Sequence, residues 1–206
     1  MNENRSETIK GIPVVIPSYE PDEQLVELCE ALVTSGITDI CIVDDGSGEE
    51  YRSIFDRIET TYADGNVRIL RHSVNMGKGR ALKTAFQDLL EHRQGLIGCV
   101  TADSDGQHTP ECITKIIDTL KANPGNLILG VRQFNKKDIP WKSWFGNTVT
   151  ITVFSYVAGM RVSDTQSGLR GIPFKFMKEL IDCKGERFEY EMQMLLECAG
   201  RYNLIS

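Results

Sequence analysis

Five short apolar runs, separated by segments long enough to form helices, constrain the fold of this 206-residue chain most strongly. The runs are rich in β-branched residues or close at a turn signal, as buried strands do. The segments between them carry apolar residues at helical spacing, as at Leu25, Leu28 and Leu32. The predicted strands are residues 12–17, 40–43, 67–70, 96–100 and 127–131. Strands that alternate with helices predict an α/β fold, with a mostly parallel, Rossmann-like sheet flanked by helices.

The fourth predicted strand ends in two carboxylates, Asp103 and Asp105, followed by the amide of Gln107. Residues i and i+2 leave a strand on the same side, so the two carboxylates can converge on one ion. Hard divalent cations prefer such oxygen ligands. The alternative interpretation is a polar strand-to-helix turn in which Asp105 or Thr109 caps a helix. Taken alone, two acids at this spacing favour the turn.

Polar side chains also follow the first two predicted strands, and this strengthens the case for a site. Pro17 closes the first strand and Tyr19 and Glu20 follow it, while Asp44 and Asp45 close the second. Ligands of parallel α/β sheets bind beyond the carboxyl ends of the strands. We therefore expect these clusters and the Asp103/Asp105 pair to meet at one edge of the sheet.

The glycine motifs of two common nucleotide-binding sites are absent from the sequence. No GxGxxG follows the first predicted strand, and the chain contains no GxxxxGK[ST], which argues against a dinucleotide site and a P-loop. The short segment Gly77-Lys78-Gly79 is either a turn that starts a helix or a loop that places Lys78 near a nucleotide.

The charge limits the possible binding partners, and the cysteines indicate the cellular compartment. A net charge of −6 argues against general nucleic-acid binding. Residues 126–185 nevertheless hold nine Lys or Arg against four Asp or Glu, a segment that suits phosphates, an anionic membrane surface or ordinary solvent. The six cysteines include no CxxC pair and predict buried, reduced thiols of a cytoplasmic protein.

The order of these motifs resembles family 2 glycosyltransferases of the GT-A fold. The closest resemblance is to the branch of dolichyl-phosphate mannosyltransferase and bacterial polyprenyl-phosphate glycosyltransferases. The resemblance covers residues 12–198, and each motif is weak alone but specific in this order. The matching pieces are VVIPSYEPDEQL, IVDDGS, NMGKGRAL, TADSDGQHTPE, Gly130-Val131-Arg132, the segment from Ser163 to Gly171, and RFEYEMQML.

The resemblance implies roles for individual residues and a metal cofactor, Mg²⁺ or Mn²⁺. Asp103, Asp105 and Gln107 resemble the metal-binding triplet. The residues implied in donor binding are Pro17, Tyr19, Glu20, Asp44, Asp45, Lys78 and Asp103, with Arg132 and Arg170 on donor or acceptor phosphates. Asp164 resembles the acid beside the acceptor, and Asp105 and Arg170 are implied in catalysis with it. Gly106 departs from the family pattern, in which a larger apolar residue is usual.

The implied organisation is a single GT-A catalytic domain over residues 1–206. Its nucleotide-binding half covers about 11–131 and its acceptor half about 132–206. The chain stops near Ser206, where a further strand is expected, so we expect a C-terminal truncation. Lys136, Lys137, Trp141, Lys142 and Trp144 precede an apolar stretch, a pattern typical of either an interfacial helix or a core helix with a surface loop.

The implied reaction is a metal-dependent, inverting transfer of a sugar from a UDP- or GDP-sugar to a polyprenyl phosphate. The expected location is the cytoplasm, at the inner face of the membrane. A phosphate acceptor is already largely ionised, so Asp164 would orient it. The alternative is a saccharide acceptor, for which Asp164 must act as a base. A nucleotidyltransferase and a non-catalytic nucleotide-binding module fit the motifs less well.

Overall fold

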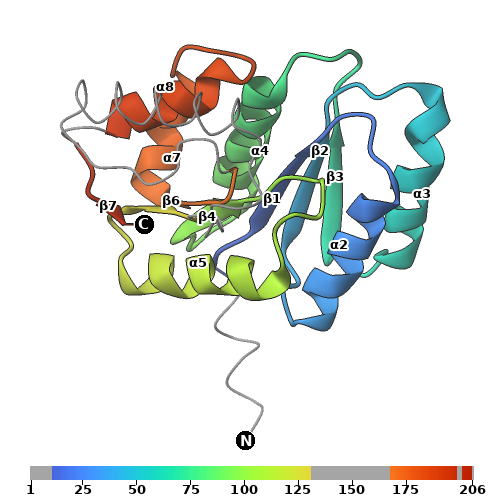
Figure 1. Cartoon of the computed structure of the whole chain (residues 1–206), viewed down its shortest axis with the longest axis horizontal. Helices are drawn as coiled ribbons and strands as arrows, with labels where there is room; N and C mark the ends of the chain where they lie inside the picture. Colours follow the sequence, from blue (N-terminus) through green and yellow to red (C-terminus); the bar gives the residue numbers. More distant parts are fainter. Residues whose placement is uncertain (1–10, 131–167, 199–200, 206) are drawn as a thin grey trace, which may run out of the picture.

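The computed structural model describes residues 11–130, 168–198 and 201–205, which form one mixed sheet between two layers of helices (Figure 1). The strands are β1 (Val14–Ser18), β2 (Ile40–Asp44), β3 (Val67–Arg71), β4 (Gly98–Thr101), β5 (Leu127–Leu129), β6 (Arg170–Pro173) and β7 (Leu204–Ile205). The helices are α2 (Glu23–Thr34), the 3₁₀ turn η1 (Glu49–Tyr51), α3 (Arg52–Thr61), α4 (Lys78–His92), α5 (Pro110–Ala122), α7 (Phe174–Ile181) and α8 (Glu189–Cys198). All five predicted strands are present in this part of the chain.

The strand order within the described residues is β3-β2-β1-β4-β6-β5-β7. The pairs β1–β2, β2–β3 and β1–β4 are parallel, so the carboxyl ends of these four strands lie at one edge. The register pairs Ser18 with Asp44 and Val15 with Thr101, which brings the loops after β1, β2 and β4 together. The predicted mostly parallel sheet is confirmed.

The strand β6 was not predicted, and it runs antiparallel to both β4 and β5. It inserts between two strands that are consecutive along the first part of the chain. Its sequence, Arg-Gly-Ile-Pro, lacks the β-branched run that identifies the other strands, so only its pairing marks it as a strand. Its position delivers the residues before it, from Gly168 on, to the end of β4.

Each face of the sheet is covered by its own group of helices (Figure 1). On one face, α4, α7 and α8 pack against inward residues such as Val15, Val43 and Ile172. On the other face, α2, α3 and α5 pack against Val14, Ile16 and their neighbours. Successive strand residues alternate between these clusters because a strand has a two-residue repeat.

The helices α2 and α5 begin where side chains cap them. Asp22 accepts a hydrogen bond from the Gln24 amide, and Thr109 accepts one from the Cys112 amide, with Pro110 as the first helical residue. Thr109 therefore has the capping role of the alternative interpretation. Because the cap occupies Thr109, the acids before it remain available for another task.

Candidate active site

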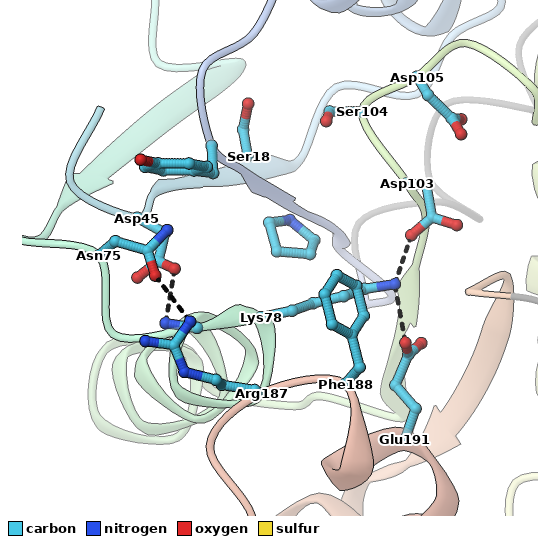
Figure 2. Close-up of a pocket in the computed structure, with 13 residues that line it drawn as sticks. Ser18, Asp45, Asn75, Lys78, Asp103, Ser104, Asp105, Arg187, Phe188 and Glu191 are labelled. Atoms are coloured by element: carbon cyan, nitrogen blue, oxygen red, sulfur yellow. Dashed lines mark hydrogen bonds and ion pairs between the residues drawn. The ribbon is translucent and has the colours of Figure 1, made fainter. Parts of the chain in front are cut away.

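A pocket of about 560 Å³ opens beyond the carboxyl ends of β1, β2 and β4 (Figure 2). The loops after these strands form one side, and the starts of α4 and α8 form the other. Its lining residues are Pro17, Ser18, Tyr19, Asp45, Asn75, Gly77, Lys78, Asp103, Ser104, Asp105, Arg187, Phe188 and Glu191. The pocket lies where the order of the parallel strands predicts a ligand site.

Two ion pairs that share Lys78 join the two sides of this pocket (Figure 2). The Lys78 ammonium lies 2.6 Å from Asp103 Oδ1 and 2.9 Å from Glu191 Oε2. Burial lowers the pKa of Lys78, but Glu191 and Asp103 outweigh this and raise it above its usual value. The lysine is therefore charged at neutral pH.

The carboxylate of Asp103 has a second side-chain neighbour on its other oxygen. His108 is buried and places its Nε2 3.5 Å from Asp103 Oδ2. Burial alone raises the pKa of Asp103, but His108 and Lys78 together lower it well below its usual range. Asp103 is thus an anion whose charge is fixed by its surroundings.

Gly168 packs directly against Asp103. A Cβ added at Gly168 would lie 2.4 Å from both carboxylate oxygens of Asp103, so the carboxylate would have to shift. The Gly168 carbonyl accepts a hydrogen bond of 2.8 Å from Thr101 Oγ1 at the end of β4. The segment entering β6 therefore borders the Asp103 carboxylate, and a glycine at position 168 leaves room for its observed position.

The carboxylate of Asp105 is more exposed than that of Asp103. Its Oδ1 accepts a 3.1 Å hydrogen bond from the Gln107 amide, and its side chain borders the pocket. Gln107 is exposed and does not line the pocket. In the described ranges no three His, Cys, Asp or Glu side chains converge as a ready-made metal cluster. Two carboxylates at one pocket nevertheless fit a hard cation that takes its remaining oxygen ligands from a phosphate and water.

The two acids at the end of β2 have different surroundings. Asp45 is buried and accepts hydrogen bonds from the amides of Met76 (3.0 Å) and Gly77 (2.7 Å). His72 Nδ1 lies 2.7 Å from the same carboxylate. Asp44 accepts from the Ser47 amide at 2.9 Å and does not line the pocket. These carboxylates shape the loops that carry the pocket residues.

Gly77, the residue before α4, has a backbone conformation that favours glycine, with φ of 101°. The amide of Gly77 donates to Asp45, and the next residue is Lys78. Asp45 thereby sets the point from which Lys78 reaches Asp103.

The loop before α8 is fastened to α4 by Glu186. Its carboxylate accepts from Arg80 (2.9 Å) and from the buried Lys83 (3.1 Å). Its carbonyl accepts from the Arg80 amide. This attachment brings Arg187 and Phe188 to the pocket.

Comparison with known proteins agrees with this geometry. The model of glycosyl transferase family 2 matches residues 14–182, which is most of the chain. The chain belongs to glycosyl transferase family 2. The resemblance drawn from the motifs is confirmed, and the protein is a glycosyltransferase.

Two relatives of this glycosyltransferase are named for a lipid phosphate or for a sugar linked to one. The UDP-N-acetylglucosamine–dolichyl-phosphate N-acetylglucosaminyltransferase of Methanococcus voltae is 28% identical over 87% of this chain and 76% of its own length. The polyprenol monophosphomannose synthase of Mycolicibacterium smegmatis is 24% identical over 87% of this chain and 69% of its own.

The GT-A fold is also confirmed by structural similarity. A mannosyltransferase of Pyrobaculum calidifontis, solved in complex with GDP-Man and Mn²⁺, matches with a TM-score of 0.63 and 16% identity. The match covers 95% of this chain but 54% of that one, so the glycosyltransferase spans about half the length of this solved neighbour.

The pocket of the glycosyltransferase gathers several residues that the motifs implied. Pro17, Tyr19, Asp45, Lys78, Asp103 and Asp105 line it. Glu20 lies outside it, and its amide donates to Ser47 Oγ at 2.9 Å. Glu20 has a φ of 50°, which is uncommon for a residue other than glycine. Such backbone conformations occur most often near functional sites. The roles of these residues stay predictions.

Arg170 has surroundings that the motif did not suggest. It is 1% exposed, does not line the pocket, and donates to the Glu191 carbonyl at 2.7 Å. Its second guanidinium nitrogen lies 3.9 Å from Glu191 Oε1. As part of β6 it supports α8, so its predicted contact with phosphate stays a prediction. Arg132, Asp164 and the tryptophan-containing segment lie outside the described residues.

Seven lining residues were assigned no role of their own from the sequence. These are Ser18, Asn75, Gly77, Ser104, Arg187, Phe188 and Glu191. The segment RFEYEMQML, one of the motifs that resemble the family, contains three of them. What gives them a role is the attachment of their loop to α4, a contact between distant segments that no local pattern indicates.

No helix in residues 11–130, 168–198 and 201–205 has both the length and the apolar character that a membrane crossing needs. The cysteines are free thiols, and all are buried except Cys112 on α5.

Proposed function

We propose that this glycosyltransferase moves a sugar from a UDP- or GDP-sugar to a polyprenyl phosphate with the help of Mg²⁺ or Mn²⁺. The observation that carries the proposal is the pair Asp103 and Asp105 at one pocket, beyond strands that also bring Pro17 and Tyr19 there. The names of two relatives support the lipid phosphate as acceptor.

Asp103 and Asp105 would hold the cation, with Gln107 as a further oxygen ligand. When bound, the cation supplies neutralisation of the negative charge that develops on the departing nucleoside diphosphate. Pro17, Tyr19, Glu20, Asp44 and Asp45 would bind or shape the binding of the nucleoside. Lys78 is a fixed positive charge in the same pocket and suits a phosphate.

The acceptor half, about residues 132–206, would bind the lipid phosphate. Arg132 suits the anion because guanidinium groups bind phosphate through two parallel hydrogen bonds. Arg170 would reach the anion only by leaving its contact with the Glu191 carbonyl. The acceptor phosphate has a second pKa of about 6, so it attacks as an anion and Asp164 orients it. Inversion at the sugar follows from a single displacement. The basic and tryptophan-rich residues 136–144 would face the inner surface of the membrane from the cytoplasm.

The alternative acceptor is a saccharide, which requires Asp164 as general base. The family match by itself does not distinguish the two acceptors.

The test is a transfer assay with labelled UDP- and GDP-sugars, offering polyprenyl phosphate or an oligosaccharide, with Mn²⁺, with Mg²⁺ and with a chelator. We expect metal-dependent transfer to the lipid phosphate and release of the nucleoside diphosphate. Transfer to the oligosaccharide alone would establish the alternative, and transfer in the presence of the chelator would refute the metal site.

A further inference from the structure

The lysine at the centre of the pocket lies where the helix itself disfavours it. Lys78 is the first residue of α4, and the helix N-terminus carries partial positive charge that repels an ammonium. Its side chain is only 19% exposed and contacts carboxylates from two distant segments, the loop after β4 and helix α8. Long-range partners, not the helix, therefore keep the lysine in this place.

The Lys78 ammonium is paired with a carboxylate oxygen that a metal ion would need as a ligand. It takes Asp103 Oδ1 at 2.6 Å, one of the oxygens that the proposed site offers to a cation. Two like charges a few ångströms apart repel each other, so a divalent ion bound by Asp103 weakens the hold of Asp103 on Lys78. Glu191 lies 2.9 Å from the ammonium on its other side and can keep it without Asp103.

We propose that Lys78 is an internal cation that shields Asp103 in the free protein, and that Glu191 is the positioning residue that retains its ammonium when Asp103 turns to a divalent ion. The proposal rests on the proposed function, because it takes Asp103 as a metal ligand. Lys78 and Glu191 thus set the affinity of the pocket for metal.

A coupling between metal and donor follows from this arrangement. In the free protein the ion competes with Lys78 for Asp103. A nucleoside diphosphate in the pocket adds oxygen ligands for the ion and an anionic partner for the ammonium. The metal is therefore expected to bind more tightly when GDP or UDP is present.

The test is a titration of the full chain with MnCl₂, following free Mn²⁺ by electron paramagnetic resonance, with and without GDP or UDP. Without nucleotide, Lys78→Met should bind Mn²⁺ at least tenfold more tightly than the unchanged protein, because a positive charge next to the ion is lost. Glu191→Gln should bind it several-fold more weakly, because Lys78 then has Asp103 as its main partner. Arg170 keeps the Glu191 carbonyl as an acceptor in that variant.

Two control variants separate a specific contact from general charge. Lys78→Arg keeps the charge and should stay close to the unchanged protein. Arg187→Met removes the same charge from the same pocket, but Arg187 donates to Asn75 Oδ1 at 3.4 Å and not to Asp103. It should raise the Mn²⁺ affinity much less than Lys78→Met does.

The outcomes distinguish this inference from the proposed function. If the unchanged protein binds no Mn²⁺ with or without nucleotide, the metal-dependent function is refuted. If it binds Mn²⁺ but Lys78→Met does not differ from Arg187→Met, the function stands and the role of Lys78 is refuted. A thermal melt identifies unfolded variants. If Lys78→Met is one of them, the result for Glu191→Gln decides, and unchanged or tighter Mn²⁺ binding there overturns the inference.

Discussion

The carboxyl ends of β2 and β4 both finish in acids, yet the two pairs have different partners. Asp44 and Asp45 accept hydrogen bonds from backbone amides of neighbouring loops. Asp103 has the Lys78 ammonium and the His108 ring as side-chain partners, and Asp105 remains largely exposed. A carboxylate that accepts hydrogen bonds from backbone amides organises a loop, whereas one paired with a lysine side chain can exchange that partner for a ligand. The two pairs therefore differ in role, loop organisation or ligand binding, because of the groups that donate hydrogen bonds to them and not because of their place in the sequence.

The largest effect expected from this contrast is on catalysis. Asp103→Asn should lower the turnover number on the order of a thousandfold, the scale on which loss of a charge-stabilising group lowers rates. Steady-state assays with saturating donor and Mn²⁺ measure it. Asp44→Asn at the end of β2 is the comparison: because Asp44 is proposed to act on donor binding, its turnover number at saturating donor should fall far less, and an equal loss in both variants would erase the distinction.

A smaller loss, about a hundredfold in turnover, is expected for Gly168→Ala. The new Cβ would lie 2.4 Å from the Asp103 oxygens and must displace the carboxylate. Gly125→Ala is the control, since a Cβ there has no neighbour within 4 Å. Assays of both variants, with circular dichroism to verify folding, test this prediction, and full activity of Gly168→Ala would show that Asp103 does not need its observed position.

The acids at β2 should affect stability. Asp45→Asn places an amide group against donors from Met76, Gly77 and His72, and should lower the free energy of unfolding by about 2 kcal/mol. Urea denaturation measures the loss. In the folded variant the Mn²⁺ affinity should change less than in Asp103→Asn, and the reverse order would make Asp45 the ligand.

The smallest effect belongs to an exposed pair beside the same edge. Arg71, at the end of β3, lies 2.7 Å from Glu59 of α3, and both side chains are about 40% exposed. Arg71→Ala should cost roughly 0.5 kcal/mol, as exposed ion pairs do. The Arg71 hydrogen bond lowers the pKa of Glu59. The pair therefore stabilises the fold above the unfolded pKa of Glu, about 4.3, and this contribution is lost as the pH falls through the lower folded value.

Urea midpoints of the Arg71→Ala and unchanged proteins, measured from pH 7 downward, test the sign. The difference should narrow only below about pH 4.3. A loss as large as that of Asp45→Asn would show that exposure does not weaken this pair.

Much of the fold was predictable because its information is local. The apolar runs before Asp44 and Asp103 mark strands by their own composition, and parallel strands bring their carboxyl ends to one edge. The order of motifs was enough to identify the family, because several short patterns at fixed spacing rarely coincide by chance.

Tertiary structure alone decided which of these acids has a cationic partner and what surrounds it. Strand β6 brings Gly168 against Asp103, and Glu186 fastens the loop before α8 to α4. These contacts join segments far apart in the chain, and their side chains carry no periodic signal. The sequence by itself determined where carboxylates end strands. Only folding placed Lys78 between Asp103 and Glu191, because the position of a charge depends on long-range packing and not on its neighbours along the chain.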